Sequence, residues 1–358
     1  MIAHHLPRHR KRAALALVVA AAIVSLLTPA IAGASLKSIW GPTTLPDGRS
    51  AFPVYKRLGV DVLQYSVRWE AVAATRPTDP RNPDDPAYRW SADVDKAVAE
   101  ARRNGIRMAL MVIGTPGWAN GGRDWRWAPA DSRDYADFLV AVSRRYPSVR
   151  HWMIWGEPSR MGNWMPLPGN SPVGPRRYAK LLDRAYGTLK RLDERNVVIG
   201  GMTFTAGDVL PANWLRWMRL PNGRPPRLDW YGHNGFSTRY PDLAKPPYHR
   251  RLRDFSDLDT LYGQLRRTYR GRRTPRIWVS EYTISSDRGN ADFSFYVSRR
   301  EQARWLRAVY RIARRTPYIA GVGWIGLVDG PDPAGLTGGL LDERGKPKPA
   351  YYAYRNAR

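Results

Sequence analysis

Two glutamates each follow a short apolar run. Glu157 stands in Trp155-Gly156-Glu157-Pro158, after the run His151–Trp155, and Glu281 directly follows the run Arg276–Ser280. A single glutamate at a strand end is more often a surface residue. Two carboxylates at the C-terminal tips of different barrel strands, however, would face each other across a barrel mouth. Such a pair suits the hydrolysis of glycosidic bonds, in which one carboxylic acid protonates the leaving oxygen and the other carboxylate attacks the sugar or activates water.

Other catalytic motifs are missing or misplaced in this sequence. Residues 321–326 fit the G-x-G-x-x-G pattern, but they lie inside a predicted strand with no helix opening on them. After residue 34 the histidines are His151, His233 and His249, and no two of them have metal-ligand spacing. Cysteine is absent, which excludes disulfides and thiolate chemistry. We therefore expect no cofactor and no metal, and paired carboxylates remain as the predicted chemistry.

Apolar runs alternate with amphipathic stretches from about residue 36 to the end of the sequence. The predicted strands are Leu36–Trp40, Val60–Trp69, Ile106–Ile113, His151–Trp155, Val197–Gly201, Leu228–His233, Arg276–Glu281 and Gly321–Leu327. Between them apolar residues recur at helical spacing, for example at Val94, Ala97, Val98 and Ala101. This alternation predicts a parallel sheet, and eight repeats favour a closed (β/α)8 TIM barrel in a single α/β domain, residues 35–358.

The longest stretches without periodicity follow the predicted strands. They are residues 71–89, 114–130, 158–174, 237–255, 284–297 and 329–341. All would lie at the C-terminal end of the barrel, and long loops in a compact domain are commonly functional. Trp118 lies in one of them, where its ring would either stack on a sugar face or hold the loop against the barrel.

The first 34 residues have the composition of a leader. Basic residues between Arg8 and Arg12 precede an uncharged apolar stretch, Ala13–Leu27, and small residues follow at Ala30-Ile31-Ala32. This order is typical of a secretory signal peptide. The apolar stretch is shorter than the about 20 residues that span a bilayer, and an uncleaved N-terminal anchor is the alternative. We expect a secreted, extracellular protein without a membrane span after the leader.

The charge balance is strongly basic. The sequence has 58 Lys and Arg against 31 Asp and Glu, a net charge of +27. Such an excess would attract acidic polymers such as nucleic acid or anionic cell-wall glycans. The alternative is an arginine-rich proteome whose charges are spread over solvated helix faces. Because the basic residues occur as scattered pairs, such as Arg102-Arg103 and Arg266-Arg267, the second interpretation is favoured and no nucleic acid partner is expected.

These segments resemble those of clan A glycoside hydrolases. Residues 155–158 resemble the Trp-Asn-Glu-Pro motif that follows strand four in that clan, and Trp278–Tyr282 resembles the strand-seven segment. Gly323-Trp324 resembles the segment that carries the strand-eight tryptophan. The whole run is most similar to bacterial members related to family 39, which are β-xylosidase-like, and to family 5, which are cellulase-like. The resemblance covers essentially all of the chain after the leader.

The resemblance implies a role for each matching residue. Glu157 would be the acid/base and Glu281 the nucleophile of a retaining mechanism, and a nearby arginine would keep the nucleophile ionised. Of the residues that match, Trp324 would form the floor of the sugar site, while His233 would lie near the cleft or be structural. The expected substrate-binding residues are Arg68, Trp118, Trp155, His233 and Trp324. Arg68, at the tip of the second strand, is the arginine expected beside Glu281.

Two positions depart from the family pattern. Gly156 stands where the family has an asparagine that contacts the sugar 2-hydroxyl, and glycine would leave open space beside the acid/base. Phe236 lies in the segment where the family often has a tyrosine that touches the nucleophile. Asn163 or Asn234 could supply the missing bond to the 2-hydroxyl.

The sequence thus predicts a secreted retaining O-glycoside hydrolase that acts on oligo- or polysaccharides through two glutamates. The alternative is a catalytically weak barrel that binds carbohydrate at the cell surface, which the departures at Gly156 and Phe236 would fit. A third interpretation is a cationic envelope or nucleic-acid-binding protein, whose polyanion binding would depend steeply on salt. The sequence leaves open the sugar, its linkage and anomeric configuration, exo or endo action, and the oligomeric state.

Overall fold

The predicted apolar runs form strands because they are rich in β-branched and aromatic residues that can be buried on both sheet faces. In the computed structural model, residues 35–291, 293–331 and 334–357 are described, and the predicted leader lies outside them. The barrel strands are β1 (Leu36–Trp40), β2 (Val62–Arg68), β3 (Arg107–Ile113), β4 (His151–Ile154), β5 (Val197–Phe204), β6 (Trp230–Asn234), β7 (Arg276–Tyr282) and β10 (Ile319–Ile325). All eight strand predictions are confirmed, with bounds that differ by a few residues.

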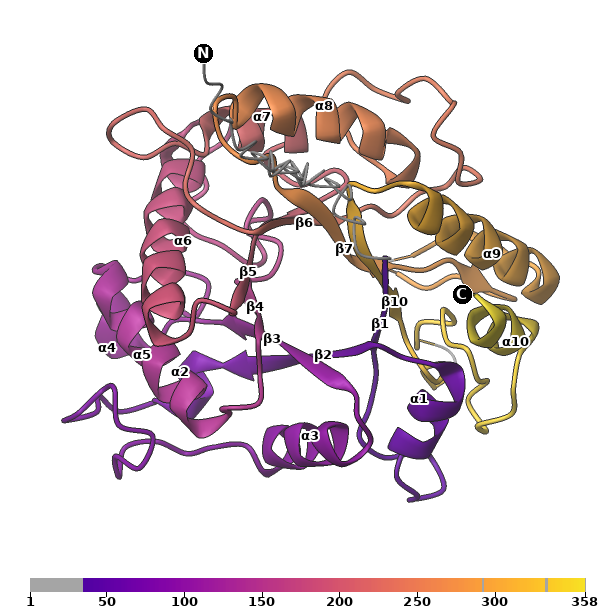
Figure 1. The fold of residues 1–358 in the computed structure, drawn as a ribbon, viewed down its shortest axis with the longest axis horizontal. Coiled ribbons are helices and arrows are strands. Elements are labelled where there is room, and N and C mark those ends of the chain that lie inside the picture. The colour runs from indigo at the N-terminus through magenta and orange to yellow at the C-terminus, as the bar shows by residue number, and fades with distance from the viewer. Residues whose placement is uncertain (1–34, 292, 332–333, 358) are drawn as a thin grey trace, which may run out of the picture. The chain divides into compact units, whose positions relative to one another are not determined.

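These strands close on themselves (Figure 1). Their order around the barrel is β1-β10-β7-β6-β5-β4-β3-β2, and each neighbouring pair is parallel. The ring is complete because β1 pairs with β10 on one side and with β2 on the other. The predicted (β/α)8 barrel is confirmed, and its strands and helices all lie between Leu36 and Asn356.

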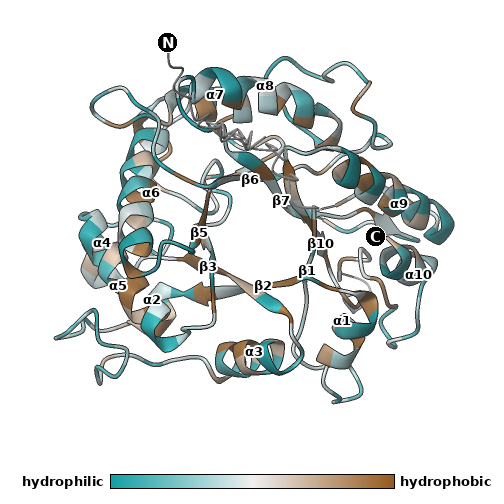
Figure 2. Cartoon of the chain, in the orientation of Figure 1, coloured by the Kyte–Doolittle hydropathy of each residue, from teal (hydrophilic) through white to brown (hydrophobic). Residues whose placement is uncertain are grey.

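Helices surround the barrel and return the chain from one strand to the next (Figure 1). They are α1 (Phe52–Leu58), α3 (Ala92–Arg103), α5 (Ser132–Arg145), α6 (Val173–Leu192), α7 (Pro211–Trp217), α8 (Leu258–Thr268) and α9 (Arg299–Arg315), and α10 (Pro349–Asn356) follows β10. Figure 2 shows a ring of helices that carry both hydrophilic and hydrophobic residues around strands, several of which are hydrophobic. The predicted α3 stripe, Val94, Ala97, Val98 and Ala101, is buried. Full burial of an aliphatic side chain of valine size contributes about 1.5–3 kcal/mol, so such stripes hold the helices on the barrel.

The inside of the barrel holds a separate apolar layer. Its buried members are Val62, Ala109, Met153, Ile199, Met202, Trp278 and Ala320. The buried Gln64 accepts from the Trp278 indole N–H at 3.0 Å and donates to the Ser280 carbonyl at 2.8 Å. A buried amide needs such partners. Because side chains fill the interior, the barrel is a solid support and its open end carries the loops.

The long loops predicted at the C-terminal end contain short elements. α2 (Trp69–Val72) follows β2, α4 (Gly117–Asn120) follows β3, and η1 (Phe255–Asp257) is a 3₁₀ turn before α8. β8 (Ser285–Ser286) and β9 (Tyr296–Val297) pair with each other within the loop after β7. Elements of this length show no sequence periodicity. Within the described ranges, no helix combines the length and the apolar character needed to cross a bilayer.

Candidate active site

Glu157 lies just past β4 in a turn with strained backbone geometry. Trp155 and Glu157 have positive φ angles of 67° and 43°, a region that non-glycine residues rarely adopt. The Trp155 indole N–H donates to the Asn163 carbonyl at 2.7 Å. The Ser159 carbonyl accepts from the Val209 N–H at 3.0 Å, which ties the turn to the loop after β5. Strain that surrounding contacts maintain is typical of functional sites, and here it fixes the direction of the Glu157 carboxylate.

Three donors converge on the Glu157 carboxylate, which belongs to a residue that is 8% exposed. Arg160 Nη1 donates to Oε2 at 2.8 Å, and Asn163 Nδ2 approaches the same oxygen at 3.4 Å. Asn234 Nδ2 donates to Oε1 at 2.9 Å. Arg160 also lies over the Phe204 ring, 4.8 Å from its centroid. Both oxygens of Glu157 therefore act as acceptors in this structure.

Asn234, at the end of β6, joins the two glutamates. Glu281 is its register partner on β7, and the Asn234 side chain is hydrogen-bonded to the Glu281 carboxyl group as well as to Glu157. The Asn234 amide oxygen accepts from the Ser280 hydroxyl, which fixes the orientation of the amide. Segments that are 124 residues apart in sequence numbering (157 and 281) thus meet at one buried amide. The structure brings the predicted pair together in the barrel mouth.

The surroundings of Glu281 favour its protonated form. Burial, and then the nearby Glu157 carboxylate, raise the pKa of Glu281 to about 8, while the Asn234 bond and the Arg160 charge act in the opposite direction. Two carboxylates in one poorly hydrated site commonly share a single proton. The raised pKa of Glu281 thus lets the carboxyl pair keep a proton at neutral pH.

The expected partnership between Arg68 and Glu281 is corrected by the structure. Arg68 forms an ion pair with Glu70 of α2 and lies over the Trp125 ring at 4.8 Å. It is not among the charges that act on Glu281. The physical reason is a nearer acid, because Glu70, two residues after Arg68, takes the guanidinium. The Arg68 side chain is about half exposed at 48%, so its role in substrate binding stays a prediction.

Two of the predicted sugar-binding tryptophans are packed inside the protein. Trp155 and Trp324 have no exposed surface. The Trp324 indole N–H donates to the Gly338 carbonyl at 2.8 Å, and the Trp155 ring packs edge-on against Trp164 at 4.8 Å. A ring without accessible surface cannot touch a ligand in this conformation. This corrects the expectation of a Trp324 sugar floor, and both rings instead support the loops around the site.

His233 is also structural in this conformation. Its side chain is fully buried, Nδ1 lies 2.8 Å from the Thr203 hydroxyl, and Nε2 lies 2.8 Å from the Arg253 carbonyl. Burial lowers the pKa of His233 to about 4. Because both ring nitrogens are engaged, this side chain does not reach a ligand, and of the two alternatives for His233 the structural one holds.

Trp118 serves at least one of its two predicted roles. Its indole N–H donates to the Ala73 carbonyl at 2.8 Å, and its ring packs edge-on against Trp69 at 5.6 Å. These contacts hold the loop after β3 against the loop after β2. The side chain keeps part of its surface accessible, so stacking on a sugar stays a prediction.

Gly156 does not leave open space beside Glu157, which corrects the sequence-based expectation. A Cβ placed on Gly156 would lie 2.8 Å from Met111 Sδ and 3.3 Å from Ile113 Cδ1. Both side chains come from β3, the neighbour of β4. Met111 therefore occupies the space that a larger residue would take at position 156.

A cavity of about 310 Å³ opens at the ends of β5, β6 and β7. Phe236 lies 5.7 Å from Phe204 and 4.9 Å from Phe293, centroid to centroid, and these three rings line the cavity. Arg239, paired with Asp254 at 2.6 Å, supplies a polar wall. Since Arg160 spans from Phe204 to Glu157, the aromatic cavity adjoins the carboxylates. The sequence analysis did not predict the role of Arg160. Its position three residues after Glu157 could have indicated an ion pair between the two side chains.

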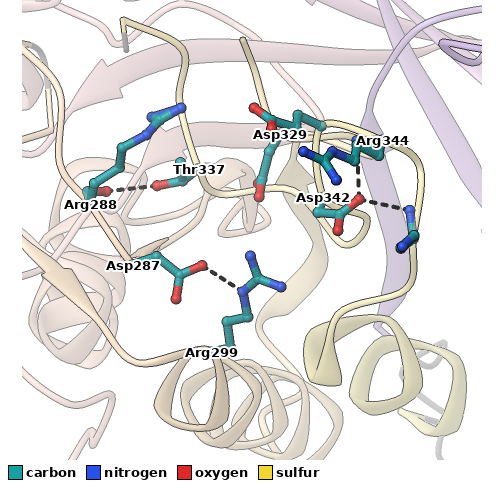
Figure 3. Close-up of a pocket in the computed structure, with 9 residues that line it drawn as sticks. Asp287, Arg288, Arg299, Asp329, Thr337, Asp342 and Arg344 are labelled. Atoms are coloured by element: carbon teal, nitrogen blue, oxygen red, sulfur yellow. Dashed lines mark hydrogen bonds and ion pairs between the residues drawn. The ribbon is translucent and has the colours of Figure 1, made fainter. Parts of the chain in front are cut away.

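A second cavity of about 350 Å³ lies among the loops after β7 and β10 (Figure 3). Asp287 pairs with Arg299 at 2.5 Å, and Asp329 accepts from the buried Lys348 ammonium at 2.9 Å. Because these charges neutralise each other in pairs, the Glu157–Glu281 pair is the better candidate for chemistry. In the described part of the chain, no group of histidine and acidic side chains is arranged to hold a metal ion.

A closed barrel of eight parallel strands with helices between them is the fold of the clan A glycoside hydrolases. Comparison with solved structures agrees with this class. A family 39 glycoside hydrolase from Bacteroides cellulosilyticus WH2 matches with a TM-score of 0.62 and 18% identity, over 90% of this chain and 63% of that chain. A glucosidase from Croceicoccus marinus matches with a TM-score of 0.65 and 14% identity, over 90% of this chain and 66% of that one.

A third match is a psychrophilic family 10 endo-β-1,4-xylanase, with a TM-score of 0.56 and 18% identity, over 90% of this chain and 96% of that chain. The predicted resemblance to clan A, and to family 39 within it, is thus confirmed for the fold. This chain spans slightly less than two thirds of the family 39 protein and of the glucosidase. No family model and no curated protein matches the sequence.

Proposed function

We propose that this protein hydrolyses O-glycosidic bonds of oligo- or polysaccharides, with Glu157 and Glu281 as the reacting pair. The observation that carries the proposal is the meeting of both carboxyl groups at Asn234 in the barrel mouth. The glycoside hydrolases among the structural neighbours support it. In a retaining reaction, Glu281 attacks the anomeric carbon as Glu157 protonates the leaving oxygen, and Glu157 then activates the water that releases the sugar.

The position of the proton sets a condition on this reaction. Burial and the Glu157 charge raise the pKa of Glu281, whereas a reaction with Glu157 as the acid needs the proton on Glu157. Arg160 is the counter-ion of Glu157, and its side chain is 46% exposed, so substrate can displace it. Displacement of this guanidinium would leave the Glu157 oxygen Oε2 free to face the leaving oxygen of the substrate. The reverse assignment has Glu281 as the acid and Glu157 as the nucleophile, and it needs no proton on Glu157. The azide reactions of Glu281→Ala and Glu157→Ala distinguish the two assignments.

A panel of aryl glycosides and polysaccharides tests the proposal. We expect turnover of at least one glycoside by the purified protein, well above the background of Glu157→Gln. Sugar binding without any turnover in either protein would contradict hydrolysis and favour the carbohydrate-binding alternative.

Asn234→Ala should lower kcat by about 100-fold with little change in KM. The amide orients both carboxylates, and loss of one preorganised donor typically costs a factor of this size. Asn222→Ala, in an exposed loop on the other end of the barrel, is the matched control. If kcat of Asn234→Ala stayed within threefold of the parent, the bridge would be structural rather than catalytic.

Gly156→Asn should destabilise the protein by roughly 1–3 kcal/mol, the usual cost of overpacking, because the new Cβ meets Met111 Sδ at 2.8 Å. The double variant Gly156→Asn/Met111→Ala should recover most of this loss, and urea unfolding measures both. An equal loss of stability in the single and double variants would show that Met111 is not the obstacle.

Comparison of a 2-deoxy glycoside with its parent glycoside tests how the sugar 2-hydroxyl is bound. Asn163 and Asn234 both lie at the Glu157 carboxylate, where either amide can serve the 2-hydroxyl. We expect the parent to lose activity on a 2-deoxy glycoside by about a thousandfold, roughly 4 kcal/mol. Equal activity on both substrates would mean that no residue makes this contact.

We also propose that the chain is exported, on the basis of the leader-like residues 1–34. N-terminal sequencing of the protein from the culture medium tests this. A protein that stays in the cell with its first residues intact would contradict export.

A further inference from the structure

The helices around the barrel end in basic residues. The cations in their last turns are Lys56 and Arg57 in α1, Arg102 and Arg103 in α3, Arg144 and Arg145 in α5, Lys190 and Arg191 in α6, Arg216 in α7, Arg266 and Arg267 in α8, Arg314 and Arg315 in α9, and Arg355 in α10. In the sequence these residues look scattered. In the fold they lie at one end of the barrel, because each helix runs back toward the N-terminal ends of the strands.

We call this end of the barrel the basal face, and define it by those last turns together with the segments that lead into the next strand. The connecting segments add Arg150, Arg195, Arg219, Arg224, Arg227, Arg270, Arg272 and Arg273. The acidic residues in the same segments are Asp61, Glu100, Asp193, Glu194 and Asp229. Cations thus outnumber acids by more than four to one on the basal face, against 58 to 31 in the whole chain.

The few acids of the basal face are mostly already paired. Asp193 pairs with Arg150 at 3.2 Å and with Arg195 at 2.7 Å, and Asp229 pairs with Lys190 at 2.9 Å. Cations at helix C-termini also interact favourably with the helix dipole. That effect accounts for basic residues in the last turns. It does not account for their excess in the connecting segments, where residues 270–273 alone hold three arginines.

The chain enters the barrel at this same face. β1 begins at Leu36, and a cavity of about 640 Å³ beside Ser35 is lined by Lys56, Arg57 and Arg355 among others. In the sequence, the apolar stretch Ala13–Leu27 precedes this point of entry.

We propose that the basal face docks on an anionic lipid membrane. The cations form a ring around the whole circumference of the barrel end, and a ring of charge matches a flat surface better than the narrow groove of a nucleic acid duplex. Each Lys or Arg near an anionic bilayer strengthens binding by roughly a factor of five. Docking in this orientation turns the Glu157–Glu281 end of the barrel away from the membrane, toward material outside it. The proposal does not depend on the proposed hydrolysis.

Vesicle sedimentation tests the docking surface. The chain from Ser35 onward is used, since the barrel is complete between Leu36 and Asn356, with vesicles of 30% phosphatidylglycerol in phosphatidylcholine at low and physiological salt. The variant Lys56→Gln/Arg102→Gln/Arg266→Gln removes one exposed cation from each of three basal helix ends. We expect its affinity to fall roughly a hundredfold relative to the parent, and binding of both proteins to weaken as salt rises.

The matched control removes the same charge from the other end of the barrel. Arg176→Gln/Arg177→Gln/Arg300→Gln changes three exposed arginines in the first turns of α6 and α9 and should bind within about threefold of the parent. Equal weakening of both variants would show that net charge alone matters and would overturn the assigned face. The absence of parent binding at low salt, equal binding to neutral vesicles, or tighter binding to a DNA duplex at the same phosphate concentration would overturn the membrane proposal. Circular dichroism confirms that each variant is folded.

Discussion

Glu281→Ala should lower kcat/KM for an aryl glycoside by at least about 10⁴-fold, the upper end of what one positioned side chain contributes, and added azide should restore turnover with inverted product. The reason is that alanine removes the attacking group and leaves room for a small external nucleophile on the same side of the sugar. The measurement is the rate with and without azide, together with the anomeric configuration of the glycosyl azide.

Glu157→Ala gives the complementary pattern if Glu157 is the acid/base. Substrates with good leaving groups should still form the glycosyl-enzyme quickly, those with poor leaving groups should lose roughly 10²–10⁴-fold, and azide should give a product with retained configuration. Glu343→Ala, an exposed glutamate in the separate cavity by β10, should leave both substrates unaffected. If instead Glu157→Ala gives the inverted azide product, the roles are exchanged, in agreement with the raised pKa of Glu281.

The barrel could be predicted because its signals are local and repeated. Each strand is a short apolar run, each helix presents a buried stripe such as Val94–Ala101, and the alternation of the two leaves few topologies. Short elements such as α4 and the β8–β9 pair were not predicted, because four or fewer residues carry no periodicity and depend on tertiary contacts. The pairing of both glutamates followed from strand ends alone, since parallel strands bring their C-terminal tips to one end.

The partners of those glutamates were harder to predict. Asn234 and Arg160 contact Glu157 through side chains whose directions depend on the strained turn at Trp155 and Glu157. Arg68 was assigned to Glu281 by resemblance, but its side chain pairs with Glu70, two residues further along the chain. Likewise, Trp324 and His233 occupy strand ends but point into packed regions. Sequence patterns predict at which strand end a residue lies. Its burial and the direction of its side chain depend on neighbours that are far away in the chain.

The fold gives the basic residues a spatial order that the sequence does not show. Pairs such as Arg102-Arg103 and Arg266-Arg267 are separated by more than a hundred residues, which favoured an interpretation as solvated helix faces. Every crossover helix ends at the same side of a parallel barrel. Basic residues are preferred in the last turn of a helix, so the basic residues of all these helices gather at one face.

The pH dependence of the site is the second large effect that we expect. A folded-state pKa of about 8 at Glu281, against an ordinary value of 4.5, means that the folded protein holds a proton that the unfolded chain has lost between these two pH values. Unfolding then releases a proton, so this group makes stability fall as pH rises, until pH exceeds about 8. Below pH 4.5 both states hold the proton, and the contribution of Glu281 to stability is fully present.

The cleanest window lies between pH 7 and pH 9, above the range in which the buried His233, with its pKa lowered to about 4, affects stability. Over this window the parent should lose about 1 kcal/mol of unfolding free energy through Glu281. Glu281→Gln, which mimics the protonated acid at every pH, should not show this loss. Urea unfolding at both pH values measures the difference between the two proteins, and Glu343→Gln, at an exposed position, should behave like the parent. Parallel pH profiles for parent and Glu281→Gln would contradict a proton on Glu281.

The activity should depend on the proton that Glu157 and Glu281 share. A retaining reaction needs one protonated and one ionised carboxyl group, so kcat/KM of the free enzyme should fall as pH rises through about 8, where the pair loses its last proton. Arg160→Ala removes the positive charge that opposes the raised pKa of Glu281, and should therefore move this alkaline limb to higher pH. A structural role for the Arg160–Glu157 ion pair would change the rate without moving the limb. The direction of that shift thus shows whether Arg160 acts on the shared proton or only holds the loop.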